Sequence, residues 1–188
     1  MSLDPGRPGS GLELRAALDR LVAEGHETLA LLDDATFFAP QGDRWSPAEH
    51  IRHLRKTTAP VAKALRAPAW LLRFRFGRGK SPSRDFITLR DTYRGLLAAG
   101  GQAGRFAPSP EAPPADPKQR RAEIMAAWED AAGELDAVST RWSEAKLERA
   151  WLPHPLLGLL TAREMLAFTV YHTSHHLTLV AGRAGLPA

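Results

Sequence analysis

Apolar residues recur at helical spacing in four stretches of the chain, at residues 11–33, 47–65, 117–142 and 161–184. Positions three or four residues apart lie on one face of an α-helix, and charged residues fill many of the positions between them. In the first three stretches the apolar positions are Leu14, Leu18, Leu21, Leu29 and Leu32, then Ile51, Leu54, Val61 and Leu65, then Ile124, Trp128, Leu135 and Val138. No stretch has a strand pattern and none is repeated, so the sequence predicts an all-α protein with four main helices.

Two of these helices begin at clear start signals. Ser46 precedes Pro47, and Glu49 follows three residues after the serine, which is the spacing of a capping box with proline at the first helical position. Thr161 and Glu164 repeat that spacing before the fourth stretch. The second helix is therefore predicted to begin at Pro47 and the fourth at the Thr161 box.

The connection between the second and third helices is long. Residues 86–101 have the pattern of a short helix, and residues 100–119 contain five prolines and three glycines, which is typical of a loop. A long link lets the helices on either side of it run parallel. We expect a four-helix bundle with a long crossover between helices 2 and 3 (up-down-down-up), formed by a single domain at residues 11–188 after a disordered leader at residues 1–10.

Composition narrows the class of protein. The chain has 188 residues, a formal net charge of +4 and no cysteine, so it has neither disulfides nor thiolate metal ligands. No stretch reaches the ~18 consecutive apolar residues that a membrane span needs. We expect a soluble, cytoplasmic protein, in which any metal is held by nitrogen and oxygen ligands.

One segment, residues 66–84, carries six cations, one Trp and two Phe without an acidic residue. Such a segment can follow a phosphate backbone or lie on a membrane surface. It can equally be the end of an amphipathic helix whose arginines extend into water. We favour the second interpretation, and nucleic acid as a partner is the less favoured one.

The candidate chemistry lies in the histidines of the fourth helix. His172 and His176 stand four residues apart, so both imidazoles can reach one ion, and His175 could replace His176 at a spacing of three. The second helix offers His50 and His53 as a further ligand. If helices 2 and 4 run antiparallel, a rise of about 1.5 Å per residue brings these two groups of histidines to similar depths. A helical wheel places His50 closer than His53 to the apolar stripe, so periodicity alone favours His50.

Two motifs in this sequence resemble those of a known family. The stretch "WSPAEHIRHL" is similar to the second-helix motif of the DinB-like superfamily of metalloenzymes, and "HPLLGLLTAREMLAFTVYHTSHHL" is similar to its His-Pro-x-x-Gly turn followed by a helix with His-x-x-x-His. The order, the distance between the motifs and the four-helix layout agree over roughly residues 12–184. The resemblance implies the same fold and a metal site built from histidines.

Carried over residue by residue, the family's metal triad falls on His53, His172 and His176, with His50 and His175 as alternatives. His154 matches the histidine of the turn, where it could shape the turn or line the pocket. Thr178 stands where family members often have a glutamine. Because of this difference, the resemblance does not identify the substrate.

The resemblance implies a divalent-metal enzyme, with zinc or nickel as the favoured ion. Family members include transferases that join a low-molecular-weight thiol to an electrophile, so an S-transferase is the leading hypothesis and a metal-dependent hydrolase shares the same site. Arg73, Arg75, His154 and Thr178 are the candidate substrate-binding residues. The alternative is a non-catalytic, stress-related bundle that binds a partner or nucleic acid through residues 66–84. A homodimer is compatible with the sequence but not required by it.

Overall fold

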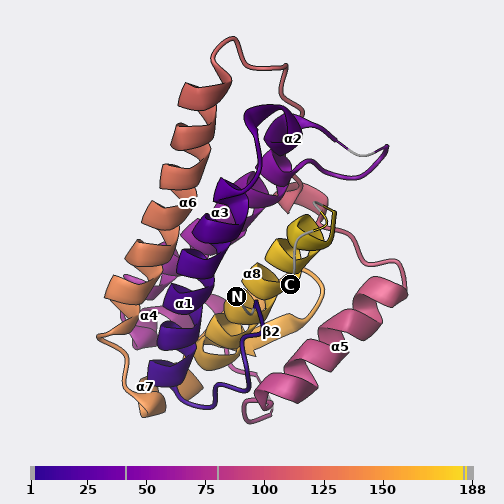
Figure 1. The fold of residues 1–188 in the computed structure, drawn as a ribbon. Coiled ribbons are helices and arrows are strands. Elements are labelled where there is room, and N and C mark those ends of the chain that lie inside the picture. Colours follow the sequence, from indigo (N-terminus) through magenta and orange to yellow (C-terminus); the bar gives the residue numbers. More distant parts are fainter. Residues whose placement is uncertain (1–2, 41, 80, 184, 186–188) are drawn as a thin grey trace.

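A computed structural model of the chain describes residues 3–40, 42–79, 81–183 and 185. Within these residues the chain forms a helical bundle with one short β-hairpin (Figure 1). The elements are α1 Gly11–Ala30, α2 Asp34–Phe38, α3 Pro47–Leu65, α4 Ala69–Phe76, α5 Phe86–Ala98, the 3-10 helix η1 Gly104–Phe106, α6 Pro117–Ser139, α7 Glu144–Arg149, β1 Trp151–His154, β2 Gly158–Thr161 and α8 Ala162–Arg183. The predicted all-α class and the four-helix bundle are confirmed, with α1, α3, α6 and α8 as the four main helices.

The crossover makes α3 and α6 parallel. Arg52, near the start of α3, pairs with Glu111 just before α6 at 2.8 Å. Arg66, which caps the end of α3, pairs with Glu134 near the end of α6 at 2.7 Å. The link between these helices holds α4, α5 and η1, and Figure 1 shows α5 on the opposite side of the bundle from α6.

The remaining main helices complete the up-down-down-up order. On α3 and α8, His50 faces His176 and His53 faces His172, so the two helices run antiparallel where they cross. On α1 and α6, Arg15 pairs with Asp136 and His26 with Glu129. Those two helices therefore also run antiparallel.

One glycine lets α1 approach the helices beside it. A Cβ atom at Gly25 would lie 2.8 Å from a methyl carbon of Leu177 on α8 and 2.9 Å from the Trp128 ring on α6. All three residues are buried, and Trp128 and Leu177 are fully so. The bare backbone at Gly25 thus permits close packing around the half of the bundle that also holds the histidines.

Both predicted capping boxes are present. The Ser46 hydroxyl accepts a hydrogen bond from the Glu49 N–H, and the Glu49 carboxylate accepts one from the Ser46 N–H. The same exchange joins Thr161 and Glu164, and the buried Glu164 carboxylate also lies 2.6 Å from Arg84 Nε. These caps fix where the two histidine-bearing helices begin, and so fix the level of their histidines.

The hairpin was not predicted. Trp151 pairs with Thr161 and His154 with Gly158, in an antiparallel register. Two prolines in this short segment, Pro153 and Pro155, obscure the strand pattern, and the turn ends at Gly158, whose φ of +73° suits glycine. The sequence predicted no strand in any stretch, and this pairing corrects that expectation.

The start of the chain is packed more closely than the expected leader. Leu3 is 2% exposed, and its carbonyl accepts a hydrogen bond of 2.6 Å from the Ser174 hydroxyl of α8. Pro8 is buried as well, and the Asp4 carbonyl accepts a hydrogen bond of 3.1 Å from Arg20 of α1. Contacts of this kind hold a terminal segment in place, and composition does not reveal them. Residues 1 and 2 of that leader, Lys80 of the basic segment, and residues 41, 184 and 186–188 of the predicted domain lie outside the described residues.

No helix in the described part of the chain is long and apolar enough to cross a membrane.

Candidate metal centre and its cavity

Three imidazoles meet where α3 crosses α8. His53 comes from the second turn of α3, and His172 and His176 come from successive turns of α8. The Nε2 atom of His172 lies 3.1 Å from Nε2 of His53 and 3.1 Å from Nε2 of His176. Ligands of a tetrahedral zinc ion, each about 2.05 Å from the metal, lie ~3.3 Å apart. These two separations are close to those of ligands on one ion, and the three ligand atoms all lie within 4.8 Å of one another.

The tautomer of His53 follows from its other contact. His53 Nδ1 lies 2.8 Å from the carbonyl oxygen of Phe106 in η1, and a carbonyl only accepts hydrogen bonds. Burial lowers the pKa of His53, so the neutral ring carries its proton on Nδ1 and keeps the Nε2 lone pair directed at His172. The crossover thus holds this candidate ligand in the orientation that coordination would need.

Burial acts on the other two imidazoles in the same direction. His172 is 3% exposed and His176 is 7% exposed, and the pKa of each is well below the ordinary value for histidine. Loss of water around the ring is the main cause, and the neighbouring imidazoles add to it. Neutral histidine is the form that binds divalent metals.

Both alternative ligands lie beside this group. His50 is also 3% exposed, and its Nδ1 lies 2.7 Å from Nδ1 of His176, on the side of that ring away from His172. His175 is less buried and stacks on Tyr171, although its ring centroid is 5.2 Å from that of His176. The structure gathers His53, His172 and His176 as the group that could hold an ion, and His50 contacts one of its members.

Trp45 covers this group and was not singled out as a site residue. Its ring stacks on His176, with 6.0 Å between centroids, and lies 4.9 Å from the His53 ring. Trp45 also lines a second hollow with His175 and His176. The signal was present in the Trp-Ser start of the motif, but spacing alone does not give a role to a residue before a helix.

His154 takes both of the roles considered for it. Its Nδ1 accepts hydrogen bonds from the N–H groups of Leu156 and Leu157, at 3.2 and 3.0 Å, and so shapes the hairpin turn. Its ring lies 4.3 Å from the Phe168 ring, which stacks on His172, and it lines the cavity described next. Burial lowers the pKa of His154 to about 4, so this imidazole is neutral at pH 7.

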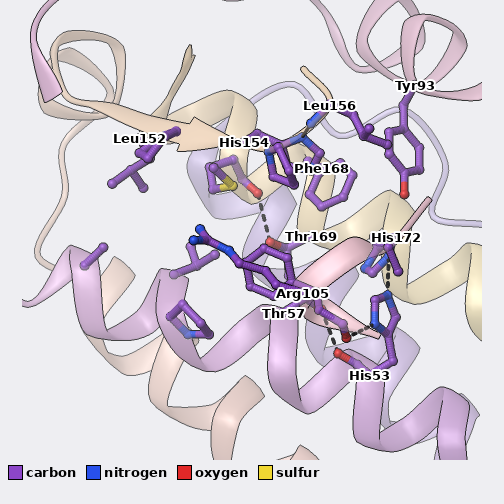
Figure 2. A pocket seen from close by; sticks show the side chains of 18 of the residues that line it. His53, Thr57, Tyr93, Arg105, Leu152, His154, Leu156, Phe168, Thr169 and His172 are labelled. Atoms are coloured by element: carbon purple, nitrogen blue, oxygen red, sulfur yellow. Dashed lines mark hydrogen bonds between the residues drawn. The ribbon is translucent and has the colours of Figure 1, made fainter. Parts of the chain in front are cut away.

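A cavity of about 220 Å³ opens beside His53 and His172 (Figure 2). Its walls come from α3, α8, the hairpin and the η1 region, and are mostly apolar. Arg105 lines it, and sequence reasoning missed this residue because it sits in the proline-rich crossover. The Tyr93 hydroxyl stays protonated at neutral pH, since burial raises the pKa of Tyr93 to about 12. The lining side chains drawn and labelled in Figure 2 include His53, Thr57, Tyr93, Arg105, Leu152, His154, Leu156, Phe168, Thr169 and His172.

Comparison with known proteins places this arrangement in a family. The model of the DinB superfamily matches residues 17–180. The chain belongs to the DinB superfamily. No curated protein sequence matches it.

Two solved structures resemble this DinB protein in fold. YfiT from Bacillus subtilis, described as a probable metal-dependent hydrolase with an unusual four-helix bundle topology, has 15% sequence identity and a TM-score of 0.57, covering 94% of this chain and 89% of its own. TT2238, described as a four-helix bundle protein, has 19% identity and a TM-score of 0.53, covering 92% of this chain and 96% of its own. At these identities the likeness shows a shared fold.

Three candidate substrate-binding residues of this DinB protein lie away from the cavity. Arg73 and Arg75 are exposed on α4 and are not among the residues that line it. Thr178 is exposed and lines a separate hollow with Leu3 and Tyr171. Six residues separate Thr178 from His172, which rotates it about 240° around α8, away from the histidines.

The donor set fits a divalent metal. Three neutral, buried imidazoles provide nitrogen ligands suited to zinc, nickel and similar ions, and three protein ligands leave a position open for a substrate atom. Phe106, through its carbonyl, and His50 supply the outer contacts that orient two of the three rings. The DinB fold thus brings together a candidate metal centre and an apolar cavity beside it.

Proposed function

We propose that this protein is a divalent-metal-dependent enzyme in which His53, His172 and His176 hold the ion. The observation that carries the proposal is the position of His172 Nε2, which lies 3.1 Å from Nε2 of His53 and 3.1 Å from Nε2 of His176, beside an apolar cavity lined by His53 and His172. When bound, a divalent ion lowers the pKa of a water or thiol that it holds and so supplies a nucleophile at neutral pH.

The chain's own residues would do the remaining work. The apolar walls hold the substrate and keep bulk water from it, which strengthens electrostatic interactions inside. Tyr93 contributes a hydroxyl that remains protonated, and its ring lies 6.2 Å from the His172 ring. Trp45 shields the opposite side of the imidazoles and fixes the ring of His176.

The finer proposal is transfer of a low-molecular-weight thiol to an electrophile. The chain contains no cysteine, so a co-substrate would have to bring the sulfur. A hydrolase, in which water is the nucleophile, would use the same three ligands and the same cavity. The family and the description of YfiT support metal-dependent chemistry in general, and the thiol is the part that experiment must decide.

Metal content is the first test. Protein purified without a His-tag or chelator, and incubated with zinc or nickel, should carry about one equivalent by mass spectrometry. The variant His172→Ala should carry almost none. Absence of metal in the parent protein would overturn the proposal.

Thiol and water are then compared directly on the loaded protein. With cysteine as the thiol and 1-chloro-2,4-dinitrobenzene as the electrophile, transfer forms a C–S bond, releases chloride and gives the thiol proton to the solvent. With 4-nitrophenyl acetate, hydrolysis releases nitrophenolate without any thiol. Metal-dependent turnover of the first alone supports the transferase, and turnover of the second alone supports the hydrolase.

A second candidate function, binding of nucleic acid, rests on the surface of α4. Trp70 is 69% exposed and Phe74 is 86% exposed, and Arg73 and Arg75 are exposed beside them. Exposed aromatic rings next to cations can stack on bases and contact phosphates. Binding to single-stranded DNA at ~50 mM salt, lost on neutralising both arginines, would support it, and absence of binding under these conditions would remove it.

A further inference from the structure

The cavity beside the metal ligands has walls suited to an apolar molecule. Side chains from α3, α4, the hairpin and α8 make up most of its surface. Aliphatic and aromatic walls favour the apolar part of a ligand, because burying that part removes it from water. The main contributors are Val61, Phe76, Leu152, Leu156, Met165 and Phe168.

Two side chains of the same cavity, Arg105 and His154, present hydrogen-bond donors to a ligand. Arg105 offers a guanidinium, which only donates hydrogen bonds. The two N–H groups of the turn already occupy Nδ1 of His154, so a neutral ring carries its proton on Nε2 and presents a second donor. Figure 2 shows both side chains among those lining the cavity. Among the described residues that line it, none is an aspartate or glutamate.

We propose that the cavity takes a substrate with an apolar body and a carboxylate, and that Arg105 and the Nε2–H group of His154 hold the carboxylate. The apolar body then extends along the wall toward His53 and His172, two of the residues that would hold the ion. The proposal deepens the metal-dependent function and rests on it for the chemistry, but binding at Arg105 needs no metal. Arginine is suited to this role because its planar fork matches a carboxylate.

The proposal is tested with three ligands that share the same apolar group and differ in charge. We use 4-phenylbutyrate, 4-phenylbutanol and 4-phenylbutylamine, and measure binding by ligand-observed NMR on the full chain loaded with zinc. The carboxylate should bind at least tenfold more tightly than the alcohol, and the amine most weakly. Equal binding of acid and alcohol would overturn the proposal.

Variants separate Arg105 from other cations and from the metal. Arg105→Gln should weaken 4-phenylbutyrate about tenfold, and Arg105→Lys should restore part of the loss. The matched control is Arg73→Gln, an exposed arginine outside the cavity, which should bind as the parent does. Binding that survives Arg105→Gln but disappears in His172→Ala would place the carboxylate on the metal and overturn the proposal. Metal content, measured separately, shows whether the proposed function itself has failed.

A different observation points to a role for His50. His50 is buried, and the distance of 2.7 Å between its Nδ1 and Nδ1 of His176 is that of a short hydrogen bond. In this bond one Nδ1 must donate and the other must accept. If His50 donated, the neutral ring of His176 would carry its proton on Nε2, where it could not bind a metal. Coordination through Nε2 therefore requires that His176 donate and His50 accept.

We infer that His50 is a positioning residue, which fixes the tautomer and the ring orientation of His176 by accepting its Nδ1–H. This inference rests on the proposed metal site. Groups in such outer positions typically change metal affinity by 10- to 100-fold. His50 thus supports the ligand set without joining it.

The test compares two replacements of His50. In His50→Asn, the amide oxygen stands near the position of Nδ1 and can accept the same hydrogen bond, so zinc affinity should stay within about threefold of the parent. In His50→Leu the acceptor is lost, and affinity should fall 10- to 100-fold in a chelator competition. His26→Leu, at an exposed position on α1, is the control.

Each outcome decides the matter. Equal affinity of the His50→Leu variant and the parent would overturn the role, as would an equal loss in the asparagine and leucine variants. Thermal unfolding of the metal-free proteins shows whether a loss comes from a damaged fold. A parent that takes up no zinc would overturn the metal site and the role of His50 together.

Discussion

The buried histidines and the exposed arginines began as two clusters of similar residues in the sequence, and the fold treats them in opposite ways. The histidines lie at a helix crossing with exposures of 3–7% for His50, His53, His172 and His176. Arg73 and Arg75 lie in water on the short helix α4. Clustering in sequence is therefore common to both groups, and burial is what distinguishes them.

Burial matters because it changes the chemistry of a side chain. Removing water from an imidazole disfavours its charged form, so the pKa of His53, His172 and His176 falls and each ring keeps a lone pair. An exposed guanidinium remains hydrated and charged, and pairs formed there contribute little free energy. The neutral imidazoles of the histidine cluster would not have to lose protons before they bind an ion. The arginines of α4, in contrast, have the environment of ordinary exposed surface residues.

The largest effect is expected from removing one of the three proposed metal ligands. His53→Ala should lower zinc affinity at least 100-fold, because two imidazoles remain and the ion loses one of three protein bonds. Chelator competition measures the change, with His26→Ala as the exposed control. If His53→Ala kept its zinc binding and His50→Ala lost it completely, His50 would be the ligand, as the helical wheel predicted.

A smaller effect is expected from pH, through His154. Its pKa is about 4 in the folded protein and near 6.5 when unfolded, so the unfolded chain takes up the proton first as pH falls. Stability from this group is complete above pH 6.5 and is lost between about pH 6.5 and 4, by about 1–3 kcal/mol.

Urea denaturation of the parent and of His154→Asn across this range measures that loss. The asparagine oxygen can still accept the N–H groups of Leu156 and Leu157, so the variant should fold at pH 7. It should lose less stability than the parent between pH 7 and 4. Identical pH profiles would mean that His154 does not contribute.

Features that depend on helical periodicity and on helix-capping residues could be predicted from the sequence. The four main helices, the two capping boxes and the order of the bundle follow from local spacing and from the length of the crossover. The wheel was less informative about α3 because this helix packs against both α6 and α8, which buries a wider arc than one stripe. His50 and His53 are consequently both buried, and only the family motif favoured His53.

Other features depend on contacts between residues that are distant in the sequence. A local sequence pattern gives no information about such contacts. Leu3 is buried against α8 although the residues after it are polar or glycine and proline. Arg105 reaches the cavity only because the crossover passes over α3, where the Phe106 carbonyl meets His53. A loop residue of this kind has no signal in periodicity.

The smallest effect is expected from the arginines of α4. The double variant Arg73→Gln with Arg75→Gln should change the free energy of unfolding by less than about 0.5 kcal/mol, because both side chains are exposed and a substitution there removes little packing. Zinc affinity should be unchanged, since neither residue lines the cavity. Urea denaturation and chelator competition measure both quantities on the same protein. A loss above 1 kcal/mol, or a change in zinc affinity, would mean that α4 is coupled to the histidines through Phe76, and the contrast between the two clusters would then have to be given up.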